Sequence, residues 1–128
     1  MNFIVETLVI SFGVILASWG LFHMLIVGGA VTMFRDIEES EARIFIMGWV
    51  SQGAFMGFLG ITPPLLLWLF GLHEEVVRIQ LALNGFGLLL LSGHVLVTGF
   101  TTHIKPIRIG TVLMAAYGAF LLLVLAFF

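Results

Sequence analysis

Four long apolar runs divide the chain and leave only short polar connectors between them. The runs cover about residues 3–34, 44–72, 79–102 and 109–128. Each has the length of roughly 20 residues that a helix needs to cross a bilayer. Lipid offers no partners to backbone N–H and C=O groups, so runs of this length predict α-helices. We therefore predict an all-α integral membrane protein: one domain over residues 1–128, folded as an up-down-up-down four-helix bundle.

Composition supports lipid as the solvent of this fold. The chain is 61% hydrophobic and only 9% charged, whereas about a quarter of the residues of a soluble domain are charged. A small soluble domain has too much surface to hide so many apolar side chains. The net charge of −2 and the lack of a basic patch argue against nucleic acid as a partner. The absence of cysteine excludes disulfides and thiolate metal sites.

The distribution of basic residues predicts the orientation. The first connector carries Arg35 and Arg43, the third carries Lys105 and Arg108, and the second carries only Arg78. Cytoplasmic loops of membrane proteins are enriched in Lys and Arg. We therefore expect the first and third connectors in the cytoplasm and both termini outside. The expected location is the inner (cytoplasmic) membrane of a bacterium or archaeon.

Two adjacent prolines, Pro63 and Pro64, interrupt the second run. Proline has no backbone N–H, so it removes a hydrogen bond from a helix interior and its ring clashes with the preceding turn. The carbonyl of Leu59 should then lack its usual helical partner. The pattern predicts a bend here, or a cavity lined by freed carbonyls.

Two histidines lie deep in the predicted membrane. His23 precedes Arg35 by 12 residues, and His94 precedes Lys105 by 11 residues. At 1.5 Å per residue, both imidazoles should lie roughly 17 Å from the cytoplasmic charges. The first and third helices run in parallel in the predicted topology. We therefore expect the two histidines to face each other across the bundle.

The neighbours of these histidines suggest an interior with room for a flat ligand. Steps of three or four residues in the third run give one polar stripe: Gln80, Asn84, Gly87, Leu91, His94, Thr98 and Thr101. The same steps in the first run give Phe12, Ile15, Trp19 and His23. Polar residues of membrane helices usually face the bundle interior, and Gly87 would let a ligand approach the backbone.

These features favour haem b as a cofactor. His23 and His94 are the candidate metal ligands, since imidazole nitrogens ligate haem iron. The remaining candidates are slot residues and cations for the propionates: Trp19, Asn84, Gly87, Thr98, Arg35, His103, Lys105 and Arg108. An equally weighted alternative is that both histidines only hydrogen-bond to neighbouring helices. Zinc is disfavoured, because four histidines at two depths cannot converge on one ion.

The chain also resembles the HemJ-type protoporphyrinogen oxidase family, whose members are small four-helix membrane proteins. The resemblance covers about half the chain and consists of short motifs: His23, the Thr62–Pro63 pair and His94. It implies haem binding through the two histidines. Ile79 and Gln80 stand where the family has a lysine at the start of the third helix, which counts against the oxidase activity itself.

Three functional interpretations remain open at this point. The first is a bis-His b-type haem protein in electron transfer, haem handling or sensing, with a haem-dependent oxidoreductase activity left open and no catalytic residue assigned. The second is a cofactor-free accessory subunit of a larger, respiratory-type membrane complex. The third is a small transporter or channel. Besides the lipid bilayer, the expected partners are further copies of the chain or a larger membrane complex, and a quinone or redox partner.

Overall fold

The computed structural model describes residues 2–34 and 36–127, and all regular structure among them is helical. The helices are α1 (Asn2–Leu25), α2 (Val27–Val31), α3 (Glu39–Phe70), α4 (Glu75–Thr98) and α5 (Lys105–Phe127). This confirms the predicted all-α class. Four of the helices, α1, α3, α4 and α5, are long and apolar enough to cross a membrane, which is consistent with an integral membrane protein.

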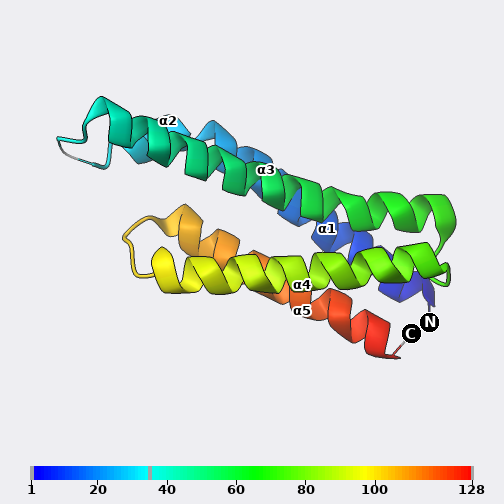
Figure 1. Cartoon of the computed structure of the whole chain (residues 1–128). Helices are drawn as coiled ribbons and strands as arrows, with labels where there is room; N and C mark the ends of the chain where they lie inside the picture. Colours follow the sequence, from blue (N-terminus) through cyan, green and yellow to red (C-terminus); the bar gives the residue numbers. More distant parts are fainter. Residues whose placement is uncertain (1, 35, 128) are drawn as a thin grey trace.

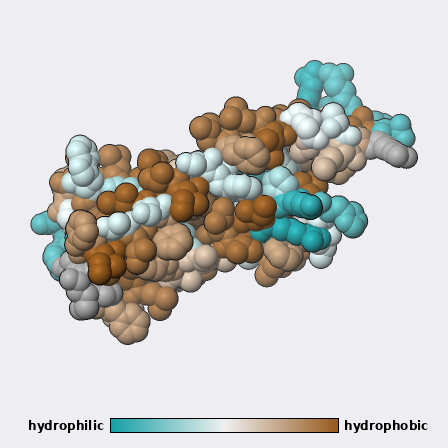
Figure 2. All heavy atoms as spheres, turned by 180° about the vertical axis from the view of Figure 1, so that it is seen from behind, coloured by the Kyte–Doolittle hydropathy of each residue, from teal (hydrophilic) through white to brown (hydrophobic). Residues whose placement is uncertain are grey.

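Large apolar side chains cover much of the outside of these helices. Trp68, Leu90 and Val97, for example, are each more than three-quarters exposed, at 77%, 79% and 83%. Figure 2 shows that hydrophobic residues cover most of the face in view, while hydrophilic residues gather toward the ends. A helix that is apolar all round suits a lipid environment rather than water.

The helices do not begin and end where the apolar runs do. The first run is interrupted at Ile26, which separates α1 from the one-turn helix α2. The helix of the second run, α3, starts before that run does. It begins at a capping box in which the Glu38 and Glu41 side chains each accept a backbone N–H. Pro106 lies in the first turn of α5, where its missing N–H costs nothing. The helices α3 and α5 therefore begin in the polar connectors, a few residues before the apolar runs at 44 and 109.

Glycines join the helices into two tight hairpins. A Cβ atom added to Gly20 of α1 would lie 2.5 Å from the carbonyl oxygen of Gly53 in α3. In the second hairpin, a Cβ atom added to Gly118 of α5 would lie 2.9 Å from the carbonyl oxygen of Gly85 in α4. Small residues at membrane helix contacts let backbones approach this closely. The α1–α3 and α4–α5 pairs are the most extensive helix contacts.

Figure 1 shows how the hairpins are arranged. The start of α1, the turn between α3 and α4, and the end of α5 lie at one end of the molecule, where the hairpins converge. The α2–α3 and α4–α5 loops lie at the other end, where α3 and α4 diverge (Figure 1). We call this the forked end.

Helix α3 continues through both prolines, and α4 supplies the missing donor. The Asn84 side-chain amide donates to the carbonyl oxygen of Leu59 at 3.0 Å and to the Thr62 hydroxyl at 2.6 Å. The Gln80 side-chain amide donates in turn to the side-chain oxygen Oδ1 of Asn84 at 2.7 Å. The carbonyl freed by Pro63 is thus paired across the hairpin interface; the bend at this position stays a prediction.

Candidate functional site

A groove of about 550 Å³ separates the N-terminal half of α3 from the C-terminal half of α4, toward the forked end. Aromatic rings of α3 line it, chiefly Phe45, Trp49 and Phe55, and His94 and Thr98 of α4 face them. A second hollow continues along α4 and is lined by Phe55, Gly87 and His94. The imidazole of His94 therefore contributes to both hollows.

The groove exists because its two walls belong to different hairpins. Here α3 packs on α1 through Trp49, which is only 4% exposed. The Trp49 indole N–H donates to the carbonyl oxygen of His23 at 2.5 Å, and its ring stacks on the His23 imidazole with centroids 4.1 Å apart. Trp49 thus fixes the wall of the groove to α1, while the opposite wall is held by α5.

His94 lies at the surface of α4 rather than in the bundle core. Its side chain is exposed along the groove, and its backbone carbonyl accepts a hydrogen bond from the Thr98 hydroxyl at 2.8 Å. The buried face of α4 runs instead through Asn84, Leu88 and Val95. Asn84 and His94 are ten residues apart, so at 3.6 residues per turn they point about 80° apart around the helix.

His23 is fully buried, with 0% of its surface exposed. Neither ring nitrogen has a hydrogen-bond partner among the residues that the structure describes. The imidazole lies against Trp49 and does not line the groove. Ligation of one haem by both histidines stays a prediction.

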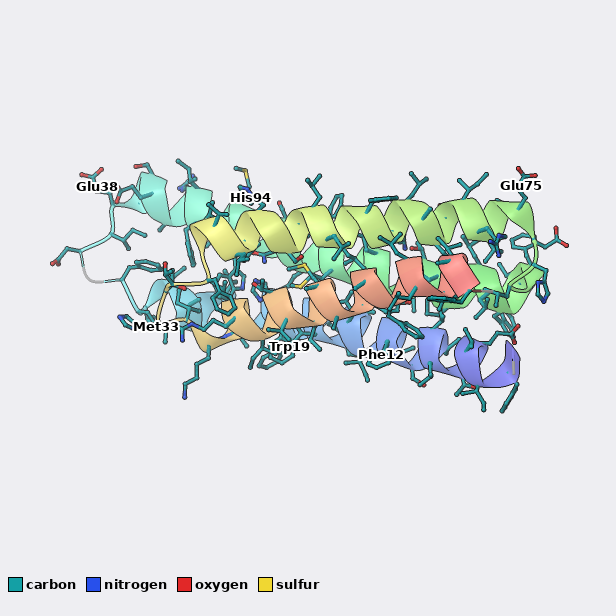
Figure 3. All side chains as sticks on the ribbon, turned by 90° about the horizontal axis from the view of Figure 1, so that it is seen from below. Phe12, Trp19, Met33, Glu38, Glu75 and His94 are labelled. Carbon is teal, nitrogen blue, oxygen red and sulfur yellow. The ribbon has the colours of Figure 1, made fainter. Side chains whose placement is uncertain are left out.

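The other predicted slot residues are spread over the bundle. Thr98 and Gly87 lie with His94 at the groove and its continuation. Trp19 and Asn84 do not line the groove: Asn84 is bound to α3 as described above, and Trp19 lies beside Gly110 of α5. Figure 3 shows His94 and Trp19 on opposite sides of the bundle.

Three of the predicted cations, His103, Lys105 and Arg108, lie at the forked end. His103 and Lys105 are exposed, in the α4–α5 loop and at the start of α5. The Arg108 guanidinium donates through Nε to the carbonyl oxygens of Phe100 and Thr102, at 2.9 and 3.1 Å. Arg35 lies outside the described residues. All three side chains are thus exposed at this end, and that of Arg108 is held against the α4–α5 loop by these bonds.

The expected interior stripe of the first helix is corrected by the structure. Phe12 and Ile15 are exposed, at 40% and 51%, and the buried face of α1 passes instead through Val9, Leu16 and His23. Steps of three and four residues fit several faces of a helix when nearly all residues are apolar. Only the glycine contacts with α3 select the face that turns inward.

Sequence reasoning missed the aromatic wall of the groove. Phe45, Trp49 and Gln52 follow each other at spacings of four and three residues, which places them on one face of α3. That spacing was available as a signal, but Trp49 was indistinguishable from a lipid-facing aromatic residue. No family model, curated protein or solved structure matches this chain, so the site rests on its own geometry.

Proposed function

We propose that the chain is an integral membrane protein whose four long helices cross the bilayer in alternating directions, with both termini outside. The exposed apolar side chains of all four helices support insertion. The forked end carries Arg43, Lys105 and Arg108 in or beside its loops, and Figure 1 shows both of these loops at the same end. The positive-inside rule then assigns the forked end to the cytoplasm.

We further propose that the groove binds a flat, largely apolar cofactor, haem b, and that His94 would hold its iron. The observation that carries this proposal is an imidazole in the wall of an otherwise apolar, aromatic groove of about 550 Å³. Ligand sites are typically apolar clefts of this size with a few polar groups that fix orientation. Lys105, and His103 when protonated, would supply positive charge for propionates at the forked end. A bound haem would supply one-electron redox chemistry.

The chain's own contribution follows from the groove. Phe45, Trp49 and Phe55 would cover the faces of the macrocycle and keep water away from it. The Thr98 hydroxyl donates to the His94 backbone carbonyl and so helps to fix the end of α4 that carries His94. Electron transfer and haem handling both fit such a site.

A visible absorption spectrum tests the proposal. The protein, expressed with ample haem and purified in mild detergent, should show a Soret band and reduced α/β bands. His94→Ala should abolish haem binding or change its coordination. His73→Ala is the matched control, because His73 is an exposed histidine in the α3–α4 turn, at the end of the molecule opposite the groove, and it should keep the wild-type band positions.

Two results would overturn this assignment. One is a wild-type protein that purifies colourless under these conditions; the other is a His94→Ala variant with the wild-type spectrum. His23→Ala tests the bis-His form separately. A six-coordinate, low-spin wild-type spectrum that becomes high-spin in His23→Ala would show that His23 is the second ligand. A spectrum unchanged by His23→Ala would leave His94 as the only histidine ligand of the pair.

A further inference from the structure

Several polar side-chain atoms are buried in the α1–α3 hairpin without partners. They are Nε1 of Trp19, both ring nitrogens of His23 and Nε2 of Gln52, and none of them has a hydrogen-bond partner among residues 2–34 and 36–127. Buried polar groups are normally paired with protein or with ordered water. An unpaired group costs about 1–3 kcal/mol, so several in one hairpin require an explanation.

These atoms lie along one seam. His23 stacks on Trp49, and Gln52 follows one turn later on the same face of α3. A Cβ atom at Gly110 would lie 3.2 Å from Nε1 of Trp19 and 3.4 Å from the sulfur of Met56. Met56 is one turn beyond Gln52. Trp19 and His23 are themselves one turn apart on α1, so the seam pairs these two residues with this face of α3.

The chemistry of the seam is mostly that of donors. The indole of Trp19 and the amide nitrogen of Gln52 only donate, whereas a neutral imidazole at His23 offers one donor and one acceptor nitrogen. A ligand for this seam must therefore accept hydrogen bonds and also be able to donate one. It must be small, since His23 has no exposed surface. Water meets these requirements, and a buried water typically makes about three hydrogen bonds to groups of this kind.

We propose that the seam between Trp19, His23 and Gln52 is an internal hydration site, which binds water in the membrane interior. Gln52 also lines the groove, so its amide provides the connection between the groove and the seam. The site would make the His23 imidazole accessible to water although no part of its ring reaches the surface. The hydration site does not depend on haem, because the unpaired atoms that define it belong to α1 and α3 and lie beside Gly110 of α5.

The two indoles of the hairpin provide a matched pair for the test. Trp49 donates its N–H to the His23 carbonyl oxygen, whereas Trp19 has no protein partner among the described residues. In ¹⁵N-tryptophan-labelled protein in bicelles, assigned by Trp→Phe substitutions, the Trp19 indole proton should show a cross-relaxation peak to water. The Trp49 indole proton should show none. Absence of a water peak for Trp19 overturns the proposal.

A pair of neighbouring substitutions tests the same point through stability. If water binds the amide nitrogen of Gln52, the Gln52→Leu substitution removes one hydrogen-bond partner of that water. The substitution should then weaken the Trp19 water peak and lower the unfolding midpoint. If the seam is dry, Gln52→Leu removes an unpaired polar atom and should raise the midpoint. Ser51→Ala, at the adjacent exposed position, should leave the Trp19 water peak unchanged. A raised midpoint for Gln52→Leu contradicts the hydration site.

Discussion

The pairing of Asn84 with the Leu59 carbonyl predicts a thermodynamic coupling between two helices. Pro63 removes the backbone N–H that would bond to this carbonyl within α3, and the Asn84 amide takes its place at 3.0 Å. Replacing Pro63 with alanine restores that N–H. The contribution of Asn84 to stability should therefore be smaller in a Pro63→Ala background than in the wild type.

The magnitude follows from the bonds that Asn84 makes. It donates to Leu59 and Thr62 and accepts from Gln80. Hydrogen bonds between membrane helices contribute about 0.6 kcal/mol on average and about 1.7 kcal/mol at most. Asn84→Leu, which keeps the number and branching of the side-chain heavy atoms, removes two bonds to α3 and should thus lower the free energy of unfolding by about 1–2 kcal/mol. About 1 kcal/mol of this loss should disappear in the Pro63→Ala background.

The assay is a double-mutant cycle measured by unfolding in mixed micelles with increasing SDS, followed by circular dichroism. Pro64→Ala is the control, since it restores an N–H for the carbonyl of Gly60, which Asn84 does not contact. Its effect should add to that of Asn84→Leu within about 0.3–0.5 kcal/mol. If Asn84→Leu costs the same in the wild-type and Pro63→Ala backgrounds, Asn84 does not replace the missing donor, and the reasoning fails.

Three further predictions concern the packing and the orientation. Gly20→Ala should destabilise the protein by about 1–3 kcal/mol in the same unfolding assay, because its methyl group would meet the α3 backbone and overpacking costs this much; Gly48→Ala, with nothing within 4 Å, should be neutral or stabilising. Tyr117→Phe removes a buried hydroxyl that donates to the carbonyl oxygen of Val9 at 3.0 Å, and it should cost about 0.6–1.7 kcal/mol; a stability equal to that of the wild type would show that this bond contributes nothing. A cysteine at Ser40, in the first turn of α3, should react with an impermeant maleimide only from the cytoplasmic face, and labelling of intact cells from outside would contradict the proposed orientation.

The number of long helices was predictable because run length alone determines it. The face that each helix turns inward was not, since almost every position is apolar and the hydrophobic pattern carries little phase information. The polar stripe of the third run correctly identified Asn84 as an interior residue. His94 lies on another face of the helix, because the three steps of the stripe from Asn84 to His94 average about 3.3 residues instead of 3.6.

The candidate site was predictable only in part for the same reason. His94 was singled out as a candidate ligand, but the wall opposite it comes from Trp49 and its neighbours on a different hairpin. Such a juxtaposition depends on where α3 and α4 diverge. That divergence is set by the glycine contacts of each helix with its own hairpin partner, such as Gly20 with Gly53. No local pattern in α3 or α4 reveals it.

The bond from Asn84 to Leu59 also has a consequence for the biogenesis of the protein. Helices α1 and α3 are synthesised first, and their glycine contacts are complete without the rest of the chain. In the proposed membrane topology, however, the Leu59 carbonyl remains unpaired until α4 has been inserted beside it. The nascent N-terminal half is therefore expected to hold the Leu59 carbonyl without its donor. Its dwell time beside the insertion machinery, and its exposure to quality-control proteases, should end when residue 84 enters the membrane.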